Sequence, residues 1–218
     1  MKAKSILILY FIVLAVELFA KITFNYQIEL FAKPLLMPIL IAWYWANIQQ
    51  KTKTEWFIFA ALIFSCLGDI FLLPQLDVFI AGLGSFLVAH VLYIFAFKQK
   101  ISFSNPIKLI GALPYLGLAV GMLVLLNPYL GELQIPVIIY TSIIALMGLF
   151  ALNRLGFVNT PSFAYVLIGA TSFMLSDSMI AINKFYYPFE LSGFLIMLTY
   201  AVGQFLIVKG MLLSNPKS

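Results

Sequence analysis

Residues 56–73 read WFIFAALIFSCLGDIFLL, an apolar run in which Asp69 is the single charged side chain. A helix that crosses a membrane needs about 20 such residues. Similar runs recur along the chain, which is 63% hydrophobic and only 10% charged and has a mean hydropathy of +1.06. A soluble domain has about 45–50% apolar and about 25% charged residues, because its surface needs polar side chains. The composition therefore predicts a polytopic integral membrane protein.

The 218 residues are long enough for about eight spans in a single integral membrane domain, residues 1–218. The apolar runs are too long and continuous for barrel strands, and short polar or Pro-, Gly- and Asn-containing turns separate them. The first run lacks a small-x-small cleavage pattern before Ala20, so we expect a retained span and not a signal peptide. The fold class is predicted to be all-α, with spans at about 5–22, 31–48, 55–73, 78–97, 107–126, 133–152, 161–182 and 189–213.

Basic residues are distributed unevenly over the predicted loops. With eight spans both termini lie on one side, and that side collects ten of the 13 Lys and Arg residues. Cytoplasmic loops carry such an excess, so both termini are predicted to be cytoplasmic. The net charge of +5 is then accounted for by these loops, and no nucleic-acid partner is expected.

A short internal repeat connects two aspartates. Asp69 follows Leu-Gly near the end of the third predicted span, and Asp177 follows Leu-Ser near the end of the seventh. This correspondence suggests two parallel copies of four spans each. Beyond the triplet the similarity is weak.

Four charged residues fall at similar depth in the predicted spans: Glu17, Lys33, Asp69 and Asp177. At about 1.5 Å per helical residue, Asp69 and Asp177 lie roughly 6–8 Å below the outer boundary. An isolated charge there costs at least about 2.5–3.5 kcal/mol, so such groups usually face the bundle interior and serve function. We expect the four to line one polar cavity. A structural ion pair of Lys33 with an acid, or snorkelling of Glu17 and Lys33 to the interface, is the alternative.

Other polar residues are candidates to support this cavity. His90 lies deeper, roughly 18 Å from the outer face, where it can orient or relay a proton or simply be a hydrogen-bonded core histidine. Tyr200 and Gln204 share one helical face at about that depth. Ser65 and Ser176 lie close to Asp69 and Asp177 in sequence, and each can orient a carboxylate or serve only as a small packing residue.

The polar residues favour carboxylate chemistry over the other hydrolytic strategies. Cys66 is the one cysteine and His90 the one histidine, so no disulfide and no metal site are predicted. A serine hydrolase would need a Gly-x-Ser-x-Gly elbow or a comparable one, which this sequence lacks. Two carboxyl groups in different surroundings can divide the roles of acid and base.

Four stretches resemble the motifs of YhhN-type membrane proteins, the bacterial relatives of the mammalian lysoplasmalogenases. They are FAKPLLMPIL (31–40), FSCLGDIFLL (64–73), GLGSFLVAHVLYIFAF (82–97) and ATSFMLSDSMIAINKF (170–185). The resemblance implies about eight helices in a bacterial inner membrane and hydrolysis of the vinyl ether of lysoplasmalogens. The products would be a fatty aldehyde and glycerophosphoethanolamine or glycerophosphocholine. It also implies a lysophospholipid substrate, no cofactor, and catalytic roles for Asp69 and Asp177.

Two other classes of function remain open at this point. A proton-coupled lipid or small-molecule transporter would use the same intramembrane Asp, His and Lys groups as a relay. Against it, the charges gather in one layer and the spans lack the paired breaks of discontinuous transporter helices. A membrane scaffold would tolerate the loss of both aspartates without loss of function.

Overall fold

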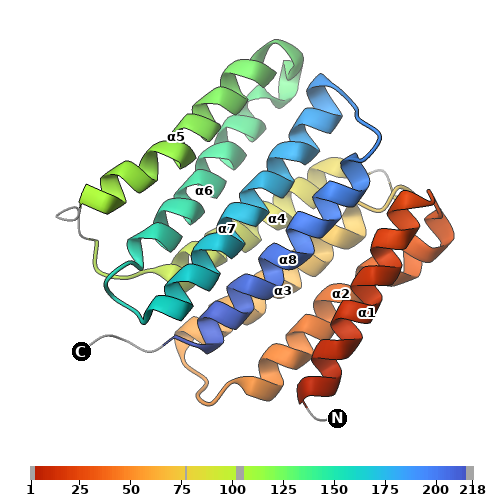
Figure 1. The fold of residues 1–218 in the computed structure, drawn as a ribbon. Coiled ribbons are helices and arrows are strands. Elements are labelled where there is room, and N and C mark those ends of the chain that lie inside the picture. Colours follow the sequence, from red (N-terminus) through yellow and green to blue (C-terminus); the bar gives the residue numbers. More distant parts are fainter. Residues whose placement is uncertain (1–2, 77, 102–105, 215–218) are drawn as a thin grey trace. The chain divides into compact units, whose positions relative to one another are not determined.

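The computed structural model describes residues 3–76, 78–101 and 106–214 (Figure 1). Within this described part, eight helices are long and apolar enough to cross a membrane, which confirms the all-α membrane architecture. The long helices are α1 (Ala3–Ile22), α2 (Tyr26–Asn47), α3 (Lys53–Phe71), α4 (Phe79–Phe97), α5 (Pro106–Leu126), α6 (Gln134–Asn153), α7 (Thr160–Ala181) and α8 (Ser192–Leu212). Short helical segments η1 (Asn127–Tyr129), η2 (Gly131–Leu133) and η3 (Ile182–Tyr186) adjoin them.

The chain divides into two compact units, Met1–Ala96 and Phe97–Ser218. Each unit holds four of the long helices, and the division falls where the two predicted sets of four spans meet. The single integral membrane domain and the parallel repeat stay predictions.

Helix α2 of the first unit begins five residues earlier than the predicted start at residue 31. The side chain of Asn25 accepts a hydrogen bond from the Ile28 backbone N–H at 3.2 Å, which caps the helix and allows it to start at Tyr26. The consequence is that Glu29 becomes a residue of the span. Thr52 and Glu55 likewise form a capping box at the start of α3.

Glycines set the spacing between α3 and α4 in the first unit. A Cβ added at Gly68 would lie 2.6 Å from the Phe86 ring, and one at Gly82 would lie 2.6 Å from the Leu72 side chain. Without Cβ atoms the two helices approach closely, as small residues allow in membrane helices. This packing fixes the C-terminal turns of α3, which carry Asp69.

In the second unit, helices α5 to α8 lie side by side in chain order (Figure 1). The closest pair is α7 and α8, where a Cβ at Gly203 would lie 2.9 Å from the Gly169 carbonyl oxygen. After Ala181 the helix widens into the π-helical turn η3. Because η3 and the turn after it occupy the residues up to Leu191, α8 begins at Ser192, three residues later than predicted.

A buried guanidinium ties the α6–α7 connection to the end of α8. Arg154 donates to the hydroxyls of Ser162 at 2.7 Å and Ser214 at 3.2 Å, and Ser162 donates to the Gly210 carbonyl at 2.7 Å. Burial lowers the pKa of Arg154 to about 10, so the group remains a cation at neutral pH.

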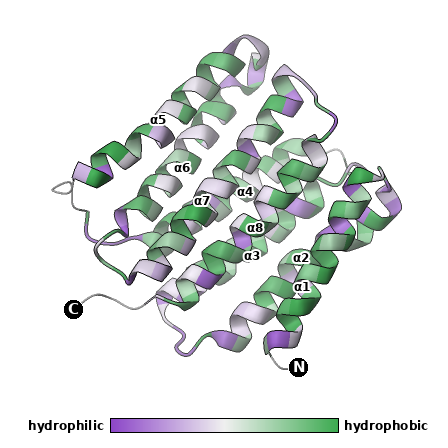
Figure 2. Ribbon diagram, in the orientation of Figure 1, coloured by the Kyte–Doolittle hydropathy of each residue, from purple (hydrophilic) through white to green (hydrophobic). Residues whose placement is uncertain are grey.

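The hydropathy of the residues differs between the helices and the turns that connect them. Most residues of the long helices are coloured hydrophobic, and hydrophilic residues recur at the helix ends and connecting turns (Figure 2). The polar residues inside the spans stand out against this background, and they form the clusters described next.

Candidate functional site

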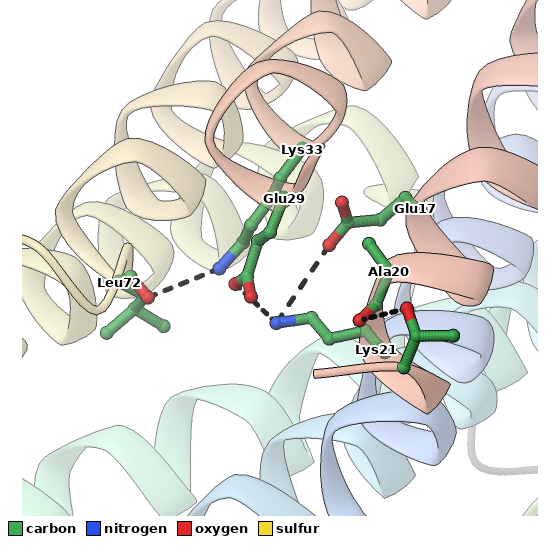
Figure 3. A network of polar contacts seen from close by, with 7 residues as sticks. Glu17, Ala20, Lys21, Glu29, Lys33 and Leu72 are labelled. Atoms are coloured by element: carbon green, nitrogen blue, oxygen red, sulfur yellow. Dashed lines mark hydrogen bonds and ion pairs between the residues drawn. The ribbon is translucent and has the colours of Figure 1, made fainter. Parts of the chain in front are cut away.

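A cluster of buried charges lies where α1 turns into α2 in the first unit (Figure 3). Glu17 and Lys21 are one turn apart on α1, and Glu29 and Lys33 are one turn apart on α2. The turn between the helices is only three residues long, and Phe24 closes it in the left-handed conformation with φ 53°. This tight connection brings the end of α1 against the start of α2.

The Lys21 ammonium lies between two carboxyl groups. It forms an ion pair with Glu29 and lies 3.9 Å from Oε1 of Glu17. Both carboxyl groups are buried, Glu17 with 0% of its surface exposed and Glu29 with 3%. The burial of Glu17 argues against the alternative in which this residue snorkels to the interface.

Lys33 points away from Lys21 and towards the end of α3 (Figure 3). Its ammonium donates to the Leu72 carbonyl at 3.3 Å, and the residue is only 8% exposed. Asp69, one turn before Leu72, is the charged group that acts most strongly on Lys33, and it also acts on Glu17. The first unit therefore brings together Glu17, Lys33 and Asp69, three of the four charges that the sequence placed in one layer.

The charges of this cluster do not balance. Glu17, Glu29 and Asp69 supply three carboxyl groups, whereas Lys21 and Lys33 supply two ammonium groups. A buried charge in hydrocarbon is costly unless it is countered. With all five groups ionised the cluster carries one net negative charge, so it suits the uptake and release of a proton.

Asp69 is buried, with 2% of its surface exposed. Its charge acts on the Tyr10 hydroxyl and on the Cys66 thiol. Ser65, one turn earlier on α3, is fully buried, and so is His90 on α4. The sequence predicted supporting roles for Ser65 and His90, and these stay predictions.

Asp177 belongs to the second unit, where α7 places it one turn before η3. It is 7% exposed, and the Tyr140 hydroxyl on α6 donates a hydrogen bond to its Oδ2. The hydroxyl of Ser176 donates instead to the Ile196 carbonyl at 2.9 Å, which ties α7 to α8. Tyr140 thus contacts Asp177 directly, and the orienting role of Ser176 stays a prediction.

Tyr200 and Gln204 lie one turn apart on α8 and are both buried in the second unit. The Tyr200 ring packs edge-on against Phe173 of α7, with a centroid distance of 5.3 Å. Both residues thus line the interior of the unit that holds Asp177. A shared cavity of Asp177 with Asp69, Glu17 and Lys33 stays a prediction.

Three residues of these clusters were missed as site candidates from the sequence. Lys21 lies at the end of the predicted span 5–22 and Glu29 in the turn before the predicted span 31–48, and neither was singled out, although the two Glu–Lys pairs with spacing of four residues were a usable signal. The side chain of Asn25 was the signal for the earlier start of α2. Tyr140 lies in an apolar run with ordinary tyrosines, and nothing in the sequence singled it out.

Metal ligation was considered for the same side chains. Within residues 3–76, 78–101 and 106–214, no group of three or more His, Cys, Asp or Glu side chains is arranged to hold a metal ion. The chemistry that the described clusters offer is proton transfer between carboxyl, hydroxyl and ammonium groups.

Comparison with known proteins identifies relatives for most of the chain. The model of the YhhN family matches residues 28–211. The human protein named lysoplasmalogenase TMEM86A is 36% identical over 155 residues, which are 69% of this chain and 62% of that protein. A Mycobacterium tuberculosis protein named lysoplasmalogenase is 34% identical over 164 residues, 72% of this chain and 60% of that protein. The matched region thus spans just over three fifths of these relatives. No solved structure matches the chain.

Proposed function

Because the chain belongs to the YhhN family, we propose that it is a lysoplasmalogenase, a membrane hydrolase of the vinyl-ether bond in lysoplasmalogens. The observation that carries the proposal is the similarity to proteins bearing that name in human and in mycobacteria, over about 70% of this chain. Buried carboxyl groups in both units support it, since vinyl-ether cleavage needs an acid and a base.

The reaction consumes one water and needs no redox step. A carboxylic acid protonates the vinyl carbon distant from the ether oxygen, and the carbon bonded to oxygen becomes part of an oxocarbenium ion. Water adds to this carbon while a carboxylate accepts the proton that water loses. The resulting hemiacetal then breaks its bond to the glycerol oxygen, and the products are a fatty aldehyde and the glycerophospho head group.

We assign the proton transfers to Asp69 and Asp177, one acting as the acid and the other as the base. General acid–base catalysis by positioned groups contributes typically about 10²–10⁴-fold to a rate. Tyr140 is a positioning residue for Asp177 through its hydrogen bond. Lys33 is a positioning residue for Asp69, because its ammonium is held at the Leu72 carbonyl and acts on that carboxyl group.

The charge excess around Asp69 fits this chemistry. In this cluster three carboxyl groups lie near two ammonium groups. The cluster is neutral when one carboxyl group is protonated, and it carries a single negative charge when that proton is lost. Asp69 and Glu17 act on one another electrostatically, and we propose that Glu17 supports proton transfer without contacting the substrate. His90, Tyr200, Gln204, Ser65 and Ser176 are proposed to shape the interior around the two aspartates.

The direct test is product formation by the purified protein in detergent. Lysoplasmenylethanolamine is incubated with the protein, and fatty aldehyde and glycerophosphoethanolamine are quantified by mass spectrometry. We expect equal amounts of the two products. The matched control is a lysolipid whose chain is joined by a saturated alkyl ether, which cannot form an oxocarbenium ion by protonation of carbon and should yield no aldehyde.

A transporter would behave differently in the same preparation. It would form no aldehyde in detergent but would move labelled lysolipid across sealed vesicles under a proton gradient. That outcome would contradict the proposal and favour the relay role of the same Asp, His and Lys residues.

A further inference from the structure

A groove between α5 and α6 in the second unit has one polar end. Its volume is about 430 Å³, and its walls are apolar side chains such as Leu109, Leu116 and Leu149. Lys108 and Asn153 are the two polar residues among its lining, and they lie together at the start of α5 and the end of α6. The groove therefore combines an apolar trough with a cationic end.

Two hydrogen bonds and an aromatic ring hold the Lys108 ammonium in place. It donates to the Asn153 backbone carbonyl at 2.9 Å and to the Asn153 side-chain oxygen at 3.1 Å, and it lies 4.6 Å from the centre of the Phe157 ring. An ammonium has three N–H donors. Two of them point to Asn153, and the described residues offer no further hydrogen-bond acceptor, so the third is available to a ligand in the groove.

This groove is separate from the Asp177–Tyr140 pair. Tyr140 and Asn153 belong to the same helix α6 and are 13 positions apart, which corresponds to about 20 Å along the axis. The polar end of the groove, at Lys108 and Asn153, lies at the other end of α6 from Tyr140. A ligand whose charged end binds Lys108 could not place that same end at Asp177.

We propose that the groove binds an anionic phospholipid, with one acyl chain along the apolar trough and the phosphate at Lys108. The charge at the end of the groove decides between occupants: an apolar helix of a partner protein would leave the third ammonium donor buried without an acceptor, whereas a lipid phosphate satisfies it. Lys98 and Lys100 lie in the adjoining connection and are exposed, which adds attraction for an anionic head group. Basic pockets between membrane helices bind such head groups.

The test measures lipid retained by the purified full-length protein. The protein is reconstituted with palmitoyl-oleoyl phosphatidylglycerol, extracted into detergent, and examined by native mass spectrometry. We expect Lys108→Gln to lower the retained lipid about fivefold, the change typical of one lysine at a lipid head group, and Lys108→Arg to restore most of it. Lys53→Gln is the charge-matched control, because that exposed lysine lies at the start of α3 and does not line the groove.

A second pair of variants tests the trough itself. Ala112 lines the groove, and Ala112→Phe fills it, whereas Leu113 is 63% exposed and does not line it, so Leu113→Phe is the control. Retention that falls in Ala112→Phe and not in Leu113→Phe supports the proposal. Equal retention in all variants, a loss in Lys108→Gln without a loss in Ala112→Phe, or full displacement by glycerol 3-phosphate would overturn it. If Lys108→Gln does not fold, as judged by gel filtration, the Ala112→Phe pair decides.

Discussion

At the scale of single residues, the first unit depends on how buried charges are countered. Lys21 bridges Glu17 on its own helix and Glu29 on the next. Lys33 acts electrostatically on Asp69 and donates a hydrogen bond to the Leu72 carbonyl. Buried ion pairs contribute little net stability as pairs, but losing one partner is expensive because the other charge stays uncompensated. We therefore expect that substitutions of these two lysines lower the stability of the protein most in this cluster.

The substitution Lys21→Met should lower the free energy of unfolding by about 3 kcal/mol, because Glu29 then remains buried without its countercharge. The double variant Lys21→Met/Glu29→Gln should recover much of that loss. Denaturant titration in micelles, followed by tryptophan fluorescence, provides the measurement. A single variant as stable as wild type would show that the ion pair does not counter a buried charge.

The substitution Tyr140→Phe should slow aldehyde release about tenfold or more, because a hydrogen bond to a charged group contributes about 1.5–3 kcal/mol. Tyr115→Phe is the matched control, since the Tyr115 hydroxyl bonds Thr171 at 2.6 Å in the same unit and touches no carboxyl group. Initial rates at saturating substrate give the comparison. Equal rates in the two variants would remove Tyr140 from the positioning of Asp177.

At the residue scale, the sequence drew attention to side chains that contrast with their surroundings. Asp69, Lys33 and Glu17 are charges inside apolar runs, and their high cost in hydrocarbon made them visible as a group. Tyr140 carries a neutral hydroxyl in a run that tolerates tyrosine, so only the fold reveals its contact with Asp177. Glu29 was assigned to a loop because the position of the α2 start depends on the cap at Asn25.

At the scale of helices, apolar runs located all eight spans but not their ends. Hydropathy measures how long a segment is apolar, whereas helix ends depend on caps and turns. The early start of α2 and the late start of α8 both arise from such local features, the Asn25 cap and the π-helical turn η3. The η3 turn directly follows the helix that carries Asp177, and π-helical turns are frequent at functional sites.

The contact between α7 and α8 depends on glycine. A Cβ at Gly203 would meet the Gly169 carbonyl at 2.9 Å and the Phe173 backbone nitrogen at 3.1 Å. Gly203→Ala should therefore separate the helices and destabilise the protein by about 1–3 kcal/mol, as overpacking typically does. Thermal unfolding in detergent measures this loss.

Gly117→Ala is the control for that prediction, because nothing lies within 4 Å of a Cβ at Gly117. Alanine has a higher helix propensity than glycine, so this variant should be as stable as wild type or slightly more stable. Equal thermal stability of Gly203→Ala and Gly117→Ala would show that close backbone contact between α7 and α8 does not depend on glycine.

At the scale of the whole molecule, composition alone determined the class of protein. A chain that is 63% hydrophobic has lipid as its solvent, and the eight helices follow from that. The orientation in the membrane stays a prediction, because it comes from the distribution of Lys and Arg and not from packing.

The orientation predicts which loops react with a membrane-impermeant maleimide in intact cells. Cys66 is the one cysteine, so a Cys66→Ser background allows single cysteines to be introduced. Glu132→Cys, between α5 and α6, should be labelled in intact cells, and Lys100→Cys, after α4, only in permeabilised cells. The reverse pattern would place the termini outside.

The central claim is that Asp69 and Asp177 together cleave the vinyl ether. It is tested by the rate of aldehyde release from lysoplasmenylethanolamine in EDTA, with Asp69→Asn, Asp177→Asn, the double variant, and the exposed-acid control Glu190→Gln. We predict that each single variant loses at least about 100-fold and that the double variant loses little more, since groups that act as a unit are not additive. The control and the EDTA-treated wild type should keep full activity. A folded Asp69→Asn or Asp177→Asn variant that releases aldehyde at the wild-type rate, or loss in EDTA that a divalent cation restores, would contradict the account.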